Sequence, residues 1–142
     1  MTELGAEFNA LSGEIVDAAY RLHRALGPGL LESIYEQVLA RDLERRGIRA
    51  ARQVSISFEY EGLEFRDACR IDILVEDRIG LEIKSVERFA PVHTKQLLTY
   101  LRLLNLPLGL LINFGAPTLK EGIYRVANTA PSASLRLCVN PS

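Results

Sequence analysis

Residues 70–87 decide the fold of this chain, and they read Arg-Ile-Asp-Ile-Leu-Val-Glu-Asp-Arg-Ile-Gly-Leu-Glu-Ile-Lys-Ser-Val-Glu. Apolar and charged residues alternate along both halves, with the period of two that is typical of a β-strand. The tripeptide Glu76-Asp77-Arg78 predicts a turn between two strands. We expect a hairpin with two faces, an apolar one with Ile71, Ile73, Val75, Ile79, Leu81 and Ile83 and a charged one with Arg70, Asp72, Glu82 and Lys84.

The length of the turn sets the register of this hairpin. If all three turn residues are unpaired, Val75 faces Ile79 and Asp72 lies directly opposite Glu82. A two-residue loop would shift the ladder by one residue and mix the two faces, so we favour the first register. Like charges directly opposite each other destabilise a sheet. A divalent cation bound by the two carboxylates would compensate this repulsion.

A second interpretation of the charged face needs no ligand. Arg70 would pair diagonally with Glu82, and Asp72 with Lys84, on a solvated surface. Exposed ion pairs of this kind are common and contribute little to stability. The hairpin alone leaves both interpretations open.

The composition of the whole chain narrows the class of protein. With 142 residues, 48% hydrophobic and 25% charged, it is typical of one soluble globular domain. No apolar run approaches the ~20 residues that span a bilayer, and the N-terminus lacks a basic segment followed by an apolar one. We therefore expect a cytoplasmic protein with no membrane partner.

Charge and cysteine content exclude several kinds of site. A net charge of −1 argues against a strongly basic surface, so any basic patch must be local. Cys69 and Cys138 lie far apart without metal-ligand spacing, which argues against zinc and a disulfide and favours small buried apolar residues. The densest basic cluster comprises Arg41, Arg45, Arg46, Arg49 and Arg52. These cations could simply stabilise the C-terminal end of a helix, or they could contact phosphates, and both explanations stay open.

Two helices are predicted before the hairpin. The first begins at Ser12 and ends near Leu26, because Gly27 and Pro28 follow. The second is opened by Gly29 and ended by Gly47. It carries Glu32 in its first turn, where the helix dipole favours an ionised carboxylate. This position suits a metal ligand and equally an ordinary first-turn acid.

The other elements complete an alternating α/β order. Residues 53–60 alternate as a strand and turn at Glu61-Gly62, with a bend expected near Asp67. A helix is predicted for about 89–105, followed by a buried strand at 108–114 that pairs in parallel with the hairpin. Shorter alternating pieces follow at 122–126 and at Leu135, Leu137 and Val139.

Four blocks of sequence resemble a known family. Asp72, nine intervening residues and then Glu82-Ile83-Lys84 resemble the PD-(D/E)XK nuclease superfamily, although Ile71 stands in place of the proline. The stretch Gly29-Leu-Leu-Glu-Ser-Ile-Tyr35 looks like the signature of the GxxExxY proteins, a prokaryotic family of that superfamily. Residues 91–101 and 110–114 are similar to its later blocks, so the resemblance runs from about residue 18 to 128.

The resemblance implies a fold, a site and an activity. The fold is α/β, with a restriction-endonuclease-like αβββαβ core, a mixed sheet flanked by helices and an extra N-terminal helix. One domain would span residues 1–142, with its core at about 29–115. The residues carried over as catalytic are Asp72, Glu82, Lys84, Glu32, Gln96 and Tyr100, and the metal ligands are Glu32, Asp72, Glu82 and the Ile83 carbonyl.

The expected activity is hydrolysis of phosphodiester bonds in DNA or RNA, with Mg²⁺ or Mn²⁺ as cofactor. The expected partner is a single-stranded or structured nucleic acid, and a homodimer is left open. The alternative is a non-catalytic nucleic-acid-binding or assembly module that retains the nuclease fold. The complete acidic and lysine set favours the enzyme, whereas the near-neutral charge favours the module.

Overall fold

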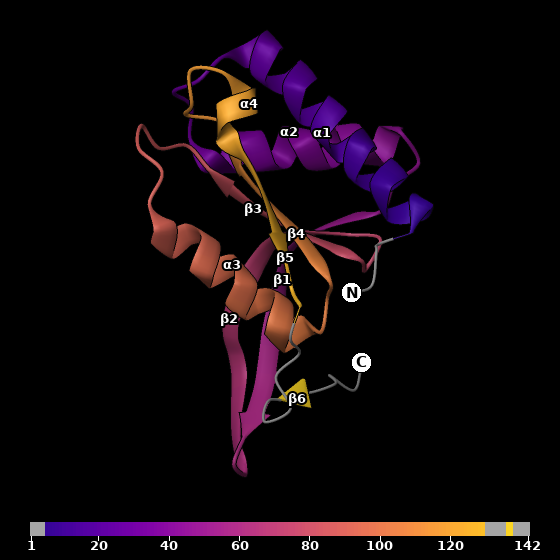
Figure 1. The fold of residues 1–142 in the computed structure, drawn as a ribbon, viewed down its shortest axis with the longest axis vertical. Helices are drawn as coiled ribbons and strands as arrows, with labels where there is room; N and C mark the ends of the chain where they lie inside the picture. The colour runs from indigo at the N-terminus through magenta and orange to yellow at the C-terminus, as the bar shows by residue number, and fades with distance from the viewer. Residues whose placement is uncertain (1–4, 130–135, 138–142) are drawn as a thin grey trace.

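The computed structural model describes residues 5–129 and 136–137. Its secondary-structure elements follow one another as α1 (Ala6–Leu26), α2 (Glu32–Arg45), β1 (Ala50–Tyr60), β2 (Leu63–Val75), β3 (Ile79–Lys84), α3 (Pro91–Leu104), β4 (Leu108–Asn113), α4 (Leu119–Gly122), β5 (Ile123–Ala127) and β6 (Arg136–Leu137). Figure 1 shows α1, α2 and α4 gathered at one side of the sheet and α3 at the other.

A mixed sheet forms the middle layer, with the strand order β5-β4-β3-β2-β1-β6. β3 and β4 are parallel and are connected through α3, whereas the other pairs are antiparallel. Two apolar clusters lie on the two faces of the sheet, one under α1 and α2 and the other under α3. The predicted αβββαβ core with an additional N-terminal helix is confirmed.

The predicted register of the β2–β3 hairpin is also confirmed. Val75 pairs with Ile79 and Ile73 pairs with Leu81, so residues 76–78 form the turn. One detail of the face assignment is wrong, because Ile71 packs in the cluster under α3 while Ile73 packs under α1 and α2. The part of β2 that precedes Ile73 is paired only with β1, so these two strands form a two-stranded ribbon there. Such a ribbon twists more strongly than a wide sheet.

Gln53 marks the point where the ribbon turns. Arg52 pairs with Ile73 and Val54 pairs with Ile71, so Gln53 stands opposite Asp72. Its backbone is left-handed, with φ of 51°. A left-handed residue inside a strand interrupts the alternation of side chains, which explains how both strands change faces here.

The predicted boundaries differ from the observed ones mainly at the first two helices. α1 begins at Ala6 rather than Ser12, and α2 begins at Glu32, after a loop that contains Gly29. The bend near Asp67 is confirmed, since its φ is 49° and the β1–β2 register shifts there. Leu135 and Val139 of the last expected strand lie outside the described residues, whereas Leu137 belongs to β6.

Two glycines allow α3 to pack closely on the sheet. A Cβ on Gly80 would lie 3.3 Å from Leu101 Cδ2 of α3 and would also clash with Ile71, and one on Gly109 would lie 3.1 Å from Leu101. α3 therefore rests directly on β3 and β4, and it covers the face on which Glu82 lies. Across the described ranges, no helix is long and apolar enough to cross a membrane.

Candidate functional site

Asp72 and Glu82 meet where β2 separates from β3. The main-chain N–H of Asp72 donates to Glu82 Oε1 at 3.2 Å, and the N–H of Ile83 donates to Asp72 Oδ2 at 2.8 Å. Each carboxylate therefore accepts a main-chain hydrogen bond from the opposite strand. The predicted cross-strand pairing of the two carboxylates is confirmed.

Burial gives Glu82 an unusual protonation equilibrium. Only 4% of Glu82 is exposed. Loss of solvation raises the pKa of its carboxyl to about 8, and the negative charge of Asp72 acts in the same direction. The Asp72 N–H and the charge of Lys84 oppose this rise. The pair thus carries less than two full negative charges at neutral pH unless a cation compensates them.

Main-chain geometry adds a third oxygen to this place. In a regular strand, the N–H and C=O of one residue point toward the same edge. The Ile83 N–H points toward β2, while the Lys84 carbonyl points the other way and accepts from the N–H of Phe114. The Ile83 carbonyl therefore faces the edge where the carboxylate of Asp72 lies.

Lys84 lies two residues after Glu82 on the same face of β3, and it is half-buried. Its charge is close enough to lower the pKa of Glu82. Tyr100 of α3 is half-buried above the same face. Burial raises the pKa of its hydroxyl, as do the charges of Cys69, Glu82 and Asp72. Lys84 and Tyr100 therefore belong to the same electrostatic environment as the carboxylate pair.

Cys69 is a further group in this environment. It is half-buried, packs against the cluster under α3, and its pKa is raised by burial and by the charge of Glu82. The expectation that Cys69 serves as a small apolar residue agrees with this packing, although it is not fully buried. Cys138 lies outside the described residues.

Sequence reasoning missed a bridge from α2 to Asp72. Gln53 Nε2 donates to Glu36 Oε1 at 2.7 Å and to Asp72 Oδ1 at 3.3 Å. Glu36 is 5% exposed, and its other oxygen accepts from Arg52 at 2.9 Å. Burial raises the pKa of Glu36, with a further contribution from the charge of Asp72. The signal in the sequence was a glutamate on the apolar side of the predicted helix, next to Tyr35 and three residues before Leu39.

Glu32 is not brought to the carboxylate pair. It is exposed at the start of α2 and lines a shallow hollow with Leu30, Leu31, Ser33 and Ser85. Glu36 follows one turn later, about 6 Å along the helix axis, and is bonded to Arg52 and Gln53 of β1. In the described part of the chain, no three His, Cys, Asp or Glu side chains are grouped so that they could hold a metal. The expected cluster of three carboxylates therefore requires correction to a pair.

The other two residues of the Gly29–Tyr35 motif have structural roles. Gly29 has φ of 103°, which favours glycine. Tyr35 is fully buried and stacks on Phe114 with ring centroids 4.4 Å apart. Its hydroxyl donates to the Gly27 carbonyl and accepts from the Leu30 N–H. The motif therefore anchors the loop between α1 and α2.

Gln96 is exposed on α3, and no hydrogen bond within residues 5–129 joins it to Asp72, Glu82 or Lys84. No contact in the described part of this structure therefore supports the catalytic role expected for Gln96. The diagonal lattice is absent as well, because no ion pair between described residues connects Arg70 with Glu82 or Lys84 with Asp72. The charged face of the hairpin is not a set of surface salt bridges.

The donor set can be tested against a divalent cation. Two carboxylates and a carbonyl are hard oxygen donors of the kind that Mg²⁺ and Mn²⁺ prefer. A cation would also favour the ionised form of Glu82, which burial opposes. Mg²⁺ retains several waters, so two carboxylates suffice for binding without a complete protein cage. Asp72, Glu82 and the Ile83 carbonyl therefore fit such an ion, and the exposed Glu32 is not grouped with them in this structure.

Comparison with known proteins places this site in a family. The sequence matches the family model described as the PD-(D/E)XK nuclease superfamily over residues 9–126. The matched range contains α2, the whole β2–β3 hairpin, α3 and β4. No curated protein and no solved structure matches the chain.

Proposed function

The chain belongs to the PD-(D/E)XK nuclease superfamily, and from this premise we propose that it is a divalent-metal-dependent nuclease that hydrolyses phosphodiester bonds in DNA or RNA. The observation that carries the proposal is the reciprocal pairing of Asp72 with Glu82 at the end of the β2–β3 ladder. Lys84 lies two residues after Glu82 on the same face of β3, and its charge lowers the pKa of Glu82. Structural salt bridges do not account for this arrangement.

Asp72, Glu82 and the Ile83 carbonyl would hold Mg²⁺ or Mn²⁺. When bound, such an ion polarises the scissile phosphate and lowers the pKa of a bound water. The chain's own contribution is to fix two oxygens before the ion arrives. The Ile83 N–H and Gln53 Nε2 orient the carboxylate of Asp72, and the Asp72 N–H orients that of Glu82.

Lys84 and Tyr100 would act on the substrate. The Lys84 ammonium would orient the attacking water and stabilise the negative charge that develops on the phosphate. The Tyr100 hydroxyl, whose pKa is raised and which therefore retains its proton, would donate to a phosphate oxygen. Glu32 and Gln96 are both exposed, and among residues 5–129 neither has a hydrogen bond to Asp72 or Glu82. Any role of theirs in the reaction would therefore consist of contacts with the bound substrate.

Finer assignments extend the same proposal. The chain would be a member of the GxxExxY family, supported by the positive φ of Gly29 and the hydrogen bonds of Tyr35. It would act as one domain over its whole length. Its substrate would be single-stranded or structured nucleic acid, because a net charge of −1 is low for binding a regular duplex by its phosphates.

The alternative is a nucleic-acid-binding or assembly module without catalysis. One observation favours it, namely that Glu32 stands apart from the carboxylate pair. The proposed chemistry nevertheless needs no third carboxylate, because it uses only Asp72, Glu82, the Ile83 carbonyl, Lys84 and Tyr100. Activity must therefore decide between the two.

A cleavage assay tests the proposal. Purified protein is incubated with single-stranded DNA, duplex DNA, hairpin RNA and single-stranded RNA, with Mg²⁺, with Mn²⁺ and with a chelator. We expect divalent-dependent cleavage of at least one substrate, lost in Asp72→Asn and retained in Glu87→Gln. Glu87 is exposed on the loop after β3, so its substitution makes the same change of charge outside the site. A folded protein that cleaves nothing would leave the module as the function.

A further inference from the structure

The outer side of α2 carries a regular stripe away from the site. Leu31, Ile34 and Val38 follow one another at intervals of three and four residues, and Arg41 and Arg45 continue the same 3-4 spacing. This spacing lines up side chains along one side of a helix and is the spacing of a coiled-coil seam. We call these five residues the α2 seam.

All five seam residues are exposed. Leu31 is 72% exposed, and Ile34 and Val38 are each 39% exposed. Scattered apolar residues on a surface are ordinary, but Ile34 and Val38 lie one turn apart on α2 and Leu31 is its N-cap, so the three form a patch of the kind that marks interaction sites. The opposite side of α2 already supplies Tyr35, Leu39 and Leu43 to the core, so the fold does not need the seam.

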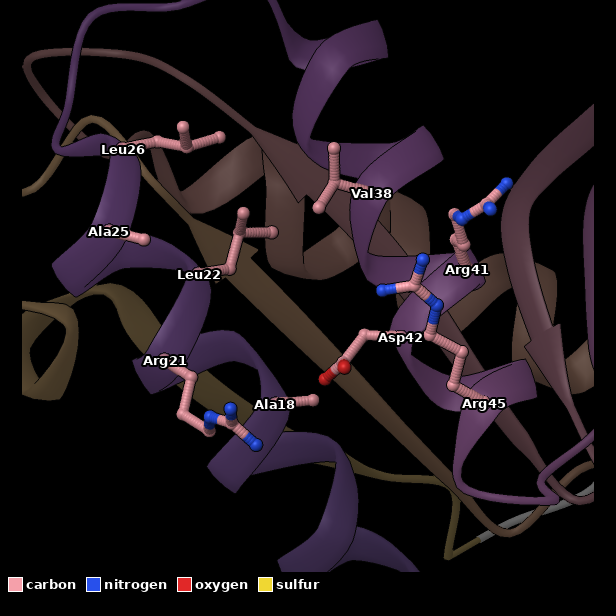
Figure 2. A pocket seen from close by; sticks show the side chains of 9 residues that line it. All are labelled: Ala18, Arg21, Leu22, Ala25, Leu26, Val38, Arg41, Asp42 and Arg45. Atoms are coloured by element: carbon pink, nitrogen blue, oxygen red, sulfur yellow. The ribbon is translucent and has the colours of Figure 1, made fainter.

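The second half of the seam borders a groove between α1 and α2. The groove has a volume of about 300 Å³. Figure 2 shows α1 contributing Leu22 and Leu26 opposite Val38 at one end, while charged side chains collect toward the other end. Leu26, which is 43% exposed, extends the apolar end of the groove. The surface is therefore apolar at one end and cationic at the other.

The cations of this groove have no hydrogen-bond or ion-pair partner among residues 5–129. Within the described residues, no hydrogen bond or ion pair engages the guanidinium of Arg21, Arg41 or Arg45. The one carboxylate of the groove, that of Asp42, is held by Arg46 at 3.3 Å. Arg46 itself binds three carboxylates, which shows that this chain pairs arginines where they are structural.

We propose that the α2 seam and its groove receive an amphipathic helix of a partner protein, with apolar side chains over Leu31–Val38 and carboxylates over Arg21, Arg41 and Arg45. Helices dock in grooves through apolar residues spaced three and four apart, and arginine is enriched at such interfaces. The acidic end follows from charge complementarity to three unpaired guanidinium groups.

Two other occupants agree less well with the charges. In a second copy of this chain packed antiparallel on the seam, Arg45 would face Leu31 and Arg41 would face Ile34, with no carboxylate for either. A parallel copy would oppose arginine to arginine. A nucleic acid would use the three arginines for its phosphates but would leave Leu26, Ile34 and Val38 against a polar backbone.

The test uses synthetic helical peptides of about three heptads. One pair carries leucine opposite the first seam positions and glutamate opposite the last, with one peptide for each chain direction. A second pair carries lysine in place of glutamate. Binding to the full chain is measured by fluorescence anisotropy up to about 1 mM. We expect one acidic peptide to bind, and both lysine peptides to bind at least about tenfold more weakly.

Three variants complete the test, with circular dichroism as the check on folding. Arg41→Glu/Arg45→Glu should no longer bind the acidic peptide and should bind the lysine peptide instead. Val38→Ser should weaken the binding of acidic and lysine peptides alike. Arg24→Glu is the matched control, because Arg24 is exposed on α1 and does not line the groove. It should leave binding unchanged.

Four outcomes would overturn the proposal. The first is equal binding of acidic and lysine peptides, and the second is no binding of either. The third is a wild-type dimer that Val38→Ser dissociates, which would make a second copy the occupant. The fourth is loss of oligonucleotide binding, but not of peptide binding, in Arg41→Glu/Arg45→Glu. The test does not depend on nuclease activity, so it can fail or succeed separately from the proposed function.

Discussion

Asp72 and Glu82 hold each other across the β2–β3 hairpin, because the Asp72 N–H donates to Glu82 Oε1 and the neighbouring Ile83 N–H donates to Asp72 Oδ2. Their carboxylates thus replace main-chain acceptors where the ladder ends after the Ile73–Leu81 pair. Past this pair, hydrogen bonds between a side chain and the main chain join β2 to β3 in place of main-chain hydrogen bonds. The same bonds that end the ladder fix two oxygens for a ligand.

Divalent ions should stabilise the folded protein. At a concentration about 100 times the Kd, an ion that binds only the folded state adds about 2.7 kcal/mol to the free energy of unfolding, or on the order of 5–10 °C in Tm. Asp72→Asn should abolish this shift. Without metal, Asp72→Asn should be slightly more stable than the wild type, because it removes a charge that repels Glu82. Calorimetry with and without Mn²⁺ measures both effects, and a destabilised metal-free variant would contradict the repulsion.

The pKa of Glu82 gives stability a definite pH dependence. The unfolded carboxyl ionises near pH 4.5, but the folded one ionises only near pH 8. The folded state therefore binds more protons between these values, and the free energy of unfolding falls as the pH rises from about 4.5 to 8. The loss is roughly a few kcal/mol.

Glu82→Gln should remove most of this dependence. Urea denaturation at several pH values, with a chelator present, compares the variant with the wild type. Glu36 has a raised pKa as well, so a smaller fall in the same direction should persist in the variant. An unchanged pH profile in Glu82→Gln would show that Glu82 ionises normally in the folded protein.

The hairpin could be predicted because its information is local. Strict alternation and a three-residue turn set the register, and the register alone places Asp72 against Glu82. The contact of Gln53 with Asp72 could not be predicted, since it depends on a left-handed residue inside a strand. Propensity argues against that conformation, and only the tertiary structure makes it favourable.

The third carboxylate was misplaced for a related reason. The motif Gly29–Tyr35 pointed to Glu32, but the depth of a side chain along a helix depends on where the helix crosses the sheet. α2 crosses β1 and β2 so that its second turn, with Glu36, is buried, while Glu32 stays exposed. The spacing of apolar residues predicts which side of a helix is buried, but it does not predict which turn of the helix lies over a particular strand.

Lys84→Ala should separate binding from catalysis. Lys84 carries a positive charge beside Glu82 that would repel a bound cation, so without it the Mn²⁺-induced rise in Tm should be kept or increased. Cleavage should fall by about 10²–10⁴, which is typical of a lost proton-transfer or charge-stabilising group. Lys95→Ala, at an exposed position on α3, is the control and should retain activity. Full activity in Lys84→Ala would remove lysine from the proposed mechanism.

Gln53 should act as a positioning residue for Asp72. Its amide is bonded to Glu36 at 2.7 Å and to Asp72 at 3.3 Å, so it ties Asp72, the carboxylate proposed to bind the metal, to Glu36 on α2. Loss of an outer-shell partner of this kind commonly costs 10–100-fold in metal affinity or activity. Simple truncation would confuse this effect with backbone strain, because φ of Gln53 is 51°.

Two variants of Gln53 separate the effects. Gln53→Gly accepts the left-handed backbone and removes only the amide, whereas Gln53→Ala removes the amide and keeps a strained residue. We expect both to lose about 10–100-fold in Mn²⁺ affinity or in kcat, and Gln53→Gly to be the more stable of the two by about 1 kcal/mol. Gln96→Ala, an exposed amide on α3, serves as the control for metal affinity. If Gln53→Gly binds Mn²⁺ as tightly as the wild type and cleaves as fast, the bridge from Glu36 through Gln53 is structural, and Asp72 is held by the Ile83 N–H alone.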